Sequence, residues 1–287
     1  MSSVVASYDP NALREISVID VEYRHEAGRS WLARVYRPRG DGPFPTLLEV
    51  HGGQWRLFDR LQNAFVDEQL AASGLVVAAV DFDSAVEAPY PSSMAQINYA
   101  TRWLKFHAPE FGGTAEAVGG LGFSSGGHMV MLQAMRPADR RYASIPFAAA
   151  TGLDARLRYV VMGWPVIDPY SRFLFTQTVA RADLIESGRL YFGDAEAMKE
   201  ANPQLILDRG ERVELPPALI VQGAADAQLT PGMPERFVEA YSAAGGIIEL
   251  GKYPGAPHGF ARDDTPNTAR AIAQIKSFIA RQLSAAG

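Results

Sequence analysis

The sequence predicts an α/β protein whose central sheet is mostly parallel. Short apolar runs rich in β-branched residues recur between turn residues, which is typical of buried strands. Longer segments between them carry apolar residues every three or four positions, which is typical of helices that cover a sheet. Because strand and helix alternate, each strand can cross back over the sheet and pair in parallel with an earlier strand.

The first two strands depart from this alternation. Apolar runs at residues 16–23 and 31–36 flank the turn residues Glu26, Ala27 and Gly28, which predicts an antiparallel hairpin at one edge of the sheet. The buried strands that follow are expected at residues 46–50, 75–81, 118–123, 159–163, 218–222 and 247–253. The clearest helices are expected at residues 61–73, 93–107, 127–135, 234–243 and 268–283.

The chain is expected to form one domain over residues 1–287, because no repeat and no Ser/Gly linker divides it. Residues 165–215 interrupt the alternation with a stretch rich in Phe, Tyr, Leu and charged side chains. We interpret this stretch as an inserted helical lobe, and an ordinary long crossover is the alternative.

Composition excludes several classes of protein. Of the 287 residues, 47% are hydrophobic and 21% are charged, a balance that supports a large core and excludes a disordered chain. A formal net charge of -5 offers no general excess of basic residues for nucleic acid or anionic membranes. The absence of cysteine excludes disulfides, zinc-thiolate sites and cysteine nucleophiles. Any covalent catalysis must therefore use another residue.

The sequence predicts neither a secretory signal nor a membrane-spanning helix. Residues 1–11 lack a basic start and a long apolar stretch, so they do not predict a secretory signal. The longest apolar runs have the length of strands and fall short of the roughly 20 residues that a spanning helix needs. We therefore expect a cytoplasmic protein without a membrane span, whose oligomeric state the sequence does not specify.

The strongest local motif is G-x-S-x-G at residues 122–126, with Ser124 at its centre. It follows a predicted strand and opens a predicted helix, which is the context of a nucleophile elbow. The glycines let neighbouring chain pass close to the bend, and the helix dipole favours negative charge near the serine. A plain Gly/Ser turn is the alternative interpretation.

Two phosphate-binding motifs compete for the same glycines, and spacing excludes both. A P-loop needs Lys and then Ser or Thr after Gly127, where His128 and Met129 stand. A dinucleotide fingerprint that began at Gly120 would need glycine in place of Ser125. Neither motif fits.

A glycine-containing loop precedes the elbow. A predicted strand runs into the sequence His-Gly-Gly-Gln-Trp at residues 51–55. Small residues let backbone N–H groups approach a reacting carbonyl, so Gly53 and Gln54, together with Ser125, are candidate donors of an oxyanion hole. The bland alternative is an ordinary glycine turn after a strand.

A serine nucleophile needs a base, and five histidines are present. His258 lies in Pro-His-Gly-Phe after the last predicted strand, at the carboxyl edge of the sheet. The other four histidines have less suitable places. His25 lies in the first hairpin and His51 opens the glycine loop, whereas His107 ends a helix and His128 lies one turn into the helix after the nucleophile.

Asp226 is the candidate acid because it directly follows the strand at residues 218–222, at the same carboxyl edge. Other aspartates fall in the insertion or after the histidine: Asp194, Asp208, Asp263 and Asp264. A lone aspartate in a loop is usually a cap or a solvated turn residue. The matching order of the three motifs favours a functional role for Asp226 over that alternative.

Together these motifs resemble the α/β-hydrolase superfamily, and more narrowly the carboxylesterases similar to hormone-sensitive lipase. The resemblance covers nearly the whole chain and implies the α/β-hydrolase fold. It implies that Ser124 is the nucleophile, that His258 is the general base and then the acid, and that Asp226 orients His258. It also assigns the oxyanion N–H groups to Gly53, Gln54 and Ser125.

Three features depart from the family pattern. Many members have a third glycine where Gln54 and Trp55 follow here, and His-Gly-Gly-x-Trp also resembles the arylformamidase branch. Phe123 and Ser125 replace the usual acidic or amidic residue and alanine around the serine. The family often has an amino-terminal cap, for which only residues 1–16 and 164–212 are available.

The expected function is a serine carboxylic ester hydrolase that forms an acyl-enzyme on a small or medium ester. Hydrolysis of a formamide, as in arylformamidases, is the alternative for a small-molecule amide. A non-catalytic receptor on the same fold is a further alternative, which the presence of His258 disfavours. The resemblance implies no metal and no organic cofactor.

Aromatic residues near the sheet edge are candidates for the substrate pocket. Trp55, Phe123 and Trp164 are the main ones, followed by Tyr170, Phe173 and Tyr191 in the insertion. Aromatic side chains are more often hydrophobic core, which is the competing interpretation.

Overall fold

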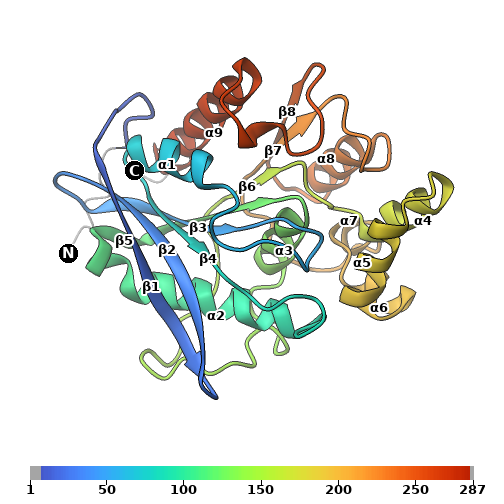
Figure 1. Ribbon diagram of the computed structural model, residues 1–287, viewed down its shortest axis with the longest axis horizontal. Helices are drawn as coiled ribbons and strands as arrows, with labels where there is room; N and C mark the ends of the chain where they lie inside the picture. Colours follow the sequence, from blue (N-terminus) through green and yellow to red (C-terminus); the bar gives the residue numbers. More distant parts are fainter. Residues whose placement is uncertain (1–7, 285–287) are drawn as a thin grey trace.

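The computed structural model describes residues 8–284 and contains one mixed sheet (Figure 1). Its strands lie in the order β1-β2-β4-β3-β5-β6-β7-β8. Both pairings of β2 are antiparallel and the remaining pairings are parallel. The strands are β1 (Ile16–Glu26), β2 (Arg29–Pro38), β3 (Phe44–Val50), β4 (Val76–Val80), β5 (Gly113–Phe123), β6 (Val160–Gly163), β7 (Ala218–Gly223) and β8 (Ile248–Tyr253). The predicted mostly parallel sheet with an antiparallel amino-terminal hairpin is therefore confirmed.

Helices cover both faces of the sheet (Figure 1). Strand residues alternate between two hydrophobic cores, so that Leu47 of β3 packs on one face and Leu48 on the other. One core contains residues of α1 (Ala64–Ala72) and α9 (Pro266–Ser284). The other contains residues of α2 (Ser92–His107), α3 (Ser125–Met135) and α8 (Met233–Ala243). A short helix, η1 (Ala108–Phe111), follows α2, and another, η2 (Phe260–Arg262), precedes α9.

Helix α9 shows why the apolar spacing predicts these helices. Its buried residues include Ala271, Ile275, Phe278 and Ile279, which recur every three or four positions and form one stripe facing the sheet. The helix extends from residue 266 to 284, slightly beyond the predicted bounds at both ends. Such differences of one or two residues are ordinary at helix ends.

The segment between β6 and β7 forms the helices α4 (Pro169–Thr178), α5 (Ala182–Phe192), α6 (Ala195–Glu200) and α7 (Pro203–Asp208). Figure 1 shows α4, α5 and α6 together beyond one end of the sheet. Three of these helices begin with a side-chain cap: Asp168 for α4, Asp194 for α6 and Asn202 for α7. We call residues 165–215 the inserted segment.

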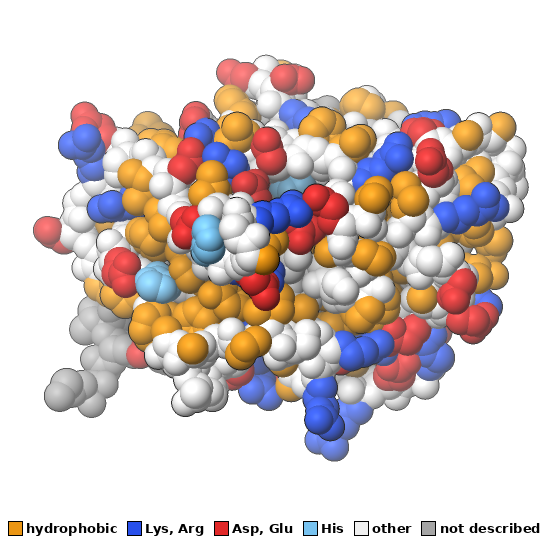
Figure 2. Space-filling view, turned by 60° about the horizontal axis from the view of Figure 1, so that its bottom comes forward, with side chains coloured by type: hydrophobic (Ala, Val, Ile, Leu, Met, Phe, Trp, Pro, Cys, Tyr) orange, Lys and Arg blue, Asp and Glu red, His pale blue; other side chains and the backbone are white. Residues whose placement is uncertain are grey.

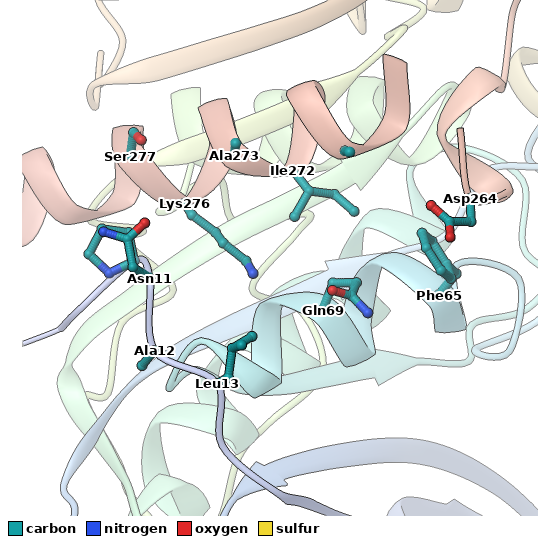
Figure 3. Close-up of a pocket in the computed structure, with 12 residues that line it drawn as sticks. Asn11, Ala12, Leu13, Phe65, Gln69, Asp264, Ile272, Ala273, Lys276 and Ser277 are labelled. Atoms are coloured by element: carbon teal, nitrogen blue, oxygen red, sulfur yellow. The ribbon is translucent and has the colours of Figure 1, made fainter. Parts of the chain in front are cut away.

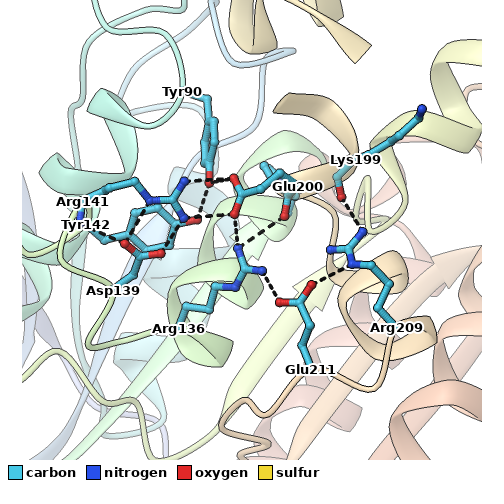
Figure 4. Close-up of polar contacts among 11 residues, drawn as sticks. Tyr90, Arg136, Asp139, Arg141, Tyr142, Lys199, Glu200, Arg209 and Glu211 are labelled. Carbon is cyan, nitrogen blue, oxygen red and sulfur yellow. Dashed lines mark hydrogen bonds and ion pairs between the residues drawn. The ribbon is translucent and has the colours of Figure 1, made fainter. Parts of the chain in front are cut away.

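A cluster of charged residues ties the inserted segment to α3 (Figure 4). Arg136, at the end of α3, pairs with Glu200 and with Glu211 at 2.5 Å each. Arg141 also contacts Glu200, and the hydroxyl of Tyr90 donates to the same carboxylate. Because α3 begins next to Ser124, this cluster connects the inserted segment to the helix that carries the elbow.

Surface charges of both signs lie next to one another on the face drawn in Figure 2. Ion pairs of the surface include Arg34 with Asp20 at 2.8 Å and Arg281 with Glu249 at 2.8 Å. No helix among residues 8–284 combines the length and the apolar character needed to cross a membrane.

Candidate active site

Ser124 occupies a sharp turn between β5 and α3, with φ 53° and ψ -115°. An L-residue rarely adopts such backbone angles, so the turn stores strain at the position of the predicted nucleophile. Glycine is needed on both sides because the chain passes so close. A Cβ on Gly122 would lie 2.4 Å from the carbonyl oxygen of Gly126, and one on Gly126 would lie 2.0 Å from that of Val50.

Three side chains that are far apart in the sequence meet beside this turn. The Oγ atom of Ser124 lies 2.9 Å from Nε2 of His258, and Nδ1 of His258 lies 2.7 Å from Oδ2 of Asp226. β5, β7 and β8 run parallel, so the loops at their carboxyl ends bring the three residues to one edge of the sheet. A serine, a histidine and an aspartate connected in this way can activate the serine hydroxyl for nucleophilic attack.

Asp226 is held by several donors besides His258. The side-chain amide of Gln222 donates to Oδ2 at 2.9 Å, and the backbone N–H of Gln228 donates to Oδ1 at 2.8 Å. Although burial opposes ionisation, these hydrogen bonds and His258 hold the pKa of Asp226 below its usual value. The ionised carboxylate can only accept, so the hydrogen on His258 lies on Nδ1 and leaves Nε2 as the basic atom.

His258 is itself largely buried, with its side chain 9% exposed. Burial lowers the pKa of His258 below its usual value, and this effect exceeds the opposing influence of Asp226. The imidazole is therefore neutral at neutral pH. A neutral imidazole with a free Nε2 atom is the form that can accept the proton of Ser124.

The glycine-containing loop lies against the same turn in an unusual conformation. Gly53 has φ +103°, and a Cβ there would lie 2.1 Å from the carbonyl oxygen of Leu57. Gln54 and Trp55 also have positive φ, at 59° and 61°. Within residues 8–284, the backbone N–H groups of Gly53, Gln54 and Ser125 donate to no protein acceptor. Three unpaired donors around a nucleophile can stabilise an oxyanion.

Side chains on several elements hold this loop in place. The backbone N–H of Trp55 donates to Oγ of Ser125 at 3.0 Å, which joins the loop to the elbow. The indole N–H of Trp55 donates to Nδ1 of His128, whose Nε2 faces the carbonyl oxygen of Ala201 at 2.7 Å. Burial lowers the pKa of His128 to about 4, so this histidine is a neutral structural link. His51 contacts the carbonyl oxygen of Gly52 at 2.8 Å, as a brace of the turn.

The three aromatic residues predicted to line the substrate pocket are core residues in this structure. Trp55, Phe123 and Trp164 are at most 2% exposed. The rings of Phe123 and Trp164 pack 5.1 Å apart behind the elbow, and Trp164 also lies 6.3 Å from the ring of His258. Their burial favours the core interpretation, and their contact with substrate stays a prediction.

Four further residues contribute to the site, and none of them belongs to a predicted motif. Gln222 and Gln228 support Asp226, Ser187 contacts Gln54, and Arg172 contacts the carbonyl oxygen of Gln228. Only Gln222 had a local signal, because it ends the predicted strand just before Asp226. The other three reach the site through the tertiary fold.

A separate cavity lies away from Ser124. A cavity of about 400 Å³ separates α1 from α9 and is lined by residues such as Phe65, Ile272 and Lys276 (Figure 3). It contains none of the three residues that meet at the elbow. Among residues 8–284, no group of three or more His, Asp or Glu side chains is arranged to hold a metal ion.

Comparison with known proteins places this geometry in a family context. The BD-FAE family model matches residues 34–240. Esterase LipC of Mycobacterium tuberculosis is 30% identical over 241 residues, which cover 80% of this chain and 57% of LipC. Carboxylic ester hydrolase LipN of the same organism is 28% identical, with 88% of this chain and 66% of LipN covered. The chain thus spans about three-fifths of the length of these relatives.

Solved structures confirm the fold. Thermogutta terrifontis esterase 2, phosphoramylated by tabun, superimposes with a TM-score of 0.74 at 21% identity. The match covers 92% of this chain and 94% of the esterase chain. The unmodified form of the same esterase gives a TM-score of 0.72 at 22% identity. The α/β-hydrolase fold that the sequence motifs imply is therefore the fold of this chain. The arylformamidase resemblance of residues 51–55 stays a prediction.

Proposed function

The chain belongs to the BD-FAE family, and on this premise we propose that it is a serine carboxylic ester hydrolase that acts through an acyl-enzyme on a small or medium ester. The observation that carries the proposal is the continuous contact from Ser124 through His258 to Asp226, at 2.9 Å and 2.7 Å. The esterase names of the relatives add support. The chain is proposed to be one domain over residues 1–287, with the inserted segment as a helical lobe beside the site.

In the first half of the proposed reaction, Nε2 of His258 takes the proton of Ser124 while Oγ attacks the ester carbonyl carbon. The carbonyl oxygen becomes an oxyanion, which the N–H groups of Gly53, Gln54 and Ser125 stabilise. When the tetrahedral intermediate collapses, the bond to the alcohol oxygen breaks. His258 gives its proton to that oxygen, the alcohol leaves, and the acyl group stays on Ser124.

In the second half, water replaces the alcohol. His258 takes a proton from the water, whose oxygen attacks the acyl carbon. Collapse of the second tetrahedral intermediate breaks the bond to Oγ, and His258 returns its proton to Ser124. The products are a carboxylic acid and the free enzyme. Asp226 remains ionised throughout and stabilises the imidazolium that forms twice in each cycle.

A covalent probe and one substitution test this function. We expect a fluorophosphonate to label the wild-type protein at Ser124 and to abolish hydrolysis of p-nitrophenyl acetate and butyrate. Ser124→Ala should lose labelling and turnover with an almost unchanged melting temperature, since serine and alanine differ little in volume. A variant that is labelled at another serine and keeps its turnover would exclude Ser124 as the nucleophile.

The same assay separates ester hydrolysis from the formamide alternative. The motif at residues 51–55 favours this alternative, so N-formyl aromatic amides belong in the substrate panel. A kcat/KM for formamides that exceeds that for every ester would assign the amide reaction. A wild-type protein that is neither labelled nor active on either class would favour the receptor interpretation.

A further inference from the structure

Arg172 of α4 reaches from the inserted segment into the neighbourhood of the triad. It faces inward with Pro169 and Thr176 and is only 4% exposed. Its Nε atom donates to the carbonyl oxygen of Gln228 at 3.3 Å, two residues beyond Asp226. Its guanidinium carbon also lies 5.6 Å from the ring centre of Trp55. The charged head therefore lies between the loop that carries the acid and the loop that carries the oxyanion donors.

No carboxylate within residues 8–284 forms an ion pair with Arg172, and its two terminal nitrogens donate to no protein acceptor. Other arginines of this region differ in this respect. Arg136 has two carboxylate partners, and Arg236 pairs with Asp168 at 2.5 Å. A buried cation is costly unless an anion compensates it, and the charges of Asp226 and Asp183 act on Arg172 without forming an ion pair with it.

Arg172 remains charged in this setting. Burial lowers the pKa of Arg172 to about 10, which still leaves it protonated at neutral pH. Its charge in turn helps to lower the pKa of His258, so the two groups interact. The guanidinium thus presents two nitrogens without a protein partner, close enough to His258 for its charge to act on that residue.

One side of the guanidinium faces apolar side chains. Arg172 borders a small cavity with side chains such as Trp55, Phe173, Leu184 and Phe192, and no other charged residue lines it. The cavity holds about 10 Å³, roughly the room for one water, so a carboxylate would meet the guanidinium at its edge and not inside it. In such an apolar setting, an ion pair with an incoming anion is stronger than at an exposed surface.

We infer that Arg172 is a specificity-determining residue that binds a carboxylate on the substrate, so that the natural substrate is an ester with a free carboxylate on its acyl or alcohol part. The planar guanidinium can hold a carboxylate through two parallel hydrogen bonds, which favours this group over a neutral one. This inference rests on the proposed ester hydrolysis. It adds a substrate class to that function.

Matched pairs of esters measure this preference in a pH-stat. Monomethyl succinate and methyl butyrate differ by a carboxylate on the acyl part, and 4-acetoxybenzoate and phenyl acetate differ by one on the alcohol part. We expect the wild-type kcat/KM to favour the anionic ester in at least one pair. In that pair, Arg172→Met should lower the ratio of anionic to neutral kcat/KM by about tenfold or more, mainly through KM. Arg172→Lys should keep part of the ratio, because it retains the charge without the planar fork.

Arg189→Met is the matched control. Arg189 lies on α5, its guanidinium carbon is 5.9 Å from the ring of Phe173, and it is exposed. Its replacement removes the same charge and the same kind of aromatic contact, yet the ratio should not change. Arg172 could instead serve only as a brace for Gln228 and Trp55. In that case Arg172→Met would lower kcat/KM for both members of each pair by the same factor, and the inference would be overturned.

A measurement on the wild-type protein covers the case in which the Arg172 variants do not fold. Succinate should inhibit hydrolysis of methyl butyrate competitively, and its inhibition constant should be lower than that of butyrate. The inference would be overturned if the two inhibition constants were equal and the wild type also showed no preference between 4-acetoxybenzoate and phenyl acetate. Failure of the proposed function would look different. In that case no ester would be hydrolysed and the fluorophosphonate would label no serine. Normal hydrolysis without a preference for anionic esters would contradict only the inference about Arg172.

Discussion

The hydroxyl of Ser187, on α5, lies 2.7 Å from Oε1 of Gln54 and 2.7 Å from the backbone carbonyl oxygen of Asp183. Gln54 is the residue whose backbone N–H is proposed for the oxyanion hole, and its φ of 59° is uncommon for a residue other than glycine. Ser187 is fully buried, whereas Gln54 is partly exposed. The inserted segment therefore holds the conformation of the oxyanion loop by a direct side-chain contact.

Removal of the Ser187 hydroxyl should weaken catalysis although every proposed donor stays in place. We expect Ser187→Ala to lower kcat severalfold with little change in KM, because the orientation of the Gln54 N–H matters most when the oxyanion forms. Gln54→Ala should have a similar effect, and the double variant should be no worse than either single variant. Steady-state kinetics on p-nitrophenyl butyrate measure all three.

Ser171→Ala provides the control for this prediction. Ser171 lies in the same segment as Ser187, but its hydroxyl donates to Thr230, outside the segment, at 3.1 Å. Its kcat should match that of the wild type. Fully additive losses in the double variant would contradict the link between Ser187 and Gln54. Proline at position 54 is a poor test, because its φ near -65° cannot match the observed 59°.

The pH dependence of hydrolysis should reflect the burial of His258. Burial lowers the pKa of His258, and the base works only when it is neutral. Activity should therefore be full above this pKa and fall as the pH drops through it, with an acid limb below the roughly 6.5 of an ordinary histidine. The pH profile of kcat/KM for methyl butyrate checks this, and a midpoint above that value would contradict it.

Asp226→Asn should show the role of the carboxylate in the same profile. Asp226 raises the pKa of His258, so its neutralisation should move the acid limb to still lower pH. It should also reduce kcat by about 10⁴, because an amide at this position no longer fixes the productive imidazole tautomer. Residual activity close to the wild-type level would show that Asp226 does not orient His258.

Sequence patterns predicted those parts of the protein that depend on local residue order, such as the strands and the positions of the three catalytic candidates. The strand ends before Ser124 and Asp226 follow from apolar runs, and the carboxyl edge follows from parallel pairing. Gln228, Ser187 and Arg172 follow no such rule, because each reaches the site through the packing of the inserted segment or a loop. The lining role of Phe123 also could not be decided, since an aromatic side chain has the same signature in a core and in a pocket.

The cluster of charged residues around Arg136, which joins the inserted segment to α3 (Figure 4), should contribute more to stability than a surface ion pair. The side chain of Arg136 is 14% exposed and contacts two carboxylates, so Arg136→Met leaves both of them without their shared partner. We expect a loss of about 1.5–3 kcal/mol in the free energy of unfolding, measured by urea denaturation. Arg156→Met is the comparison, because the side chain of Arg156 is 54% exposed and pairs with Asp154 and Glu214. It should cost at most about 1 kcal/mol, and equal losses in the two variants would contradict the prediction.

Two buried carboxyl groups beneath the active-site loop should make stability depend on pH. Glu49 of β3 and Asp67 of α1 are both fully buried, and Asn63 donates to Glu49 at 2.7 Å. Within residues 8–284, no cation pairs with either group. Burial raises the pKa of Glu49, and burial together with the charge of Glu49 raises the pKa of Asp67.

The raised pKa values of Glu49 and Asp67 should make the folded protein less stable as the pH rises. A carboxyl group whose pKa is higher in the folded than in the unfolded chain binds its proton more tightly when folded. Its contribution to stability is complete below the unfolded pKa, near 4, and is lost as the pH rises through the folded pKa. Glu49→Gln keeps a neutral, hydrogen-bonding side chain of the same shape and removes one of the two titrations. The variant should therefore gain stability relative to the wild type as the pH rises.

Urea denaturation of the wild type and of Glu49→Gln at several values between about pH 5 and pH 9 measures this difference. We expect the free energy of unfolding of the variant, minus that of the wild type, to increase up to the raised pKa of Glu49, about 8, and then to level off. Glu116→Gln is the control, because Glu116 is exposed on β5 and its replacement should leave the difference flat. A difference that stays constant for Glu49→Gln as well would mean that Glu49 is ionised in the folded protein throughout, in spite of its burial.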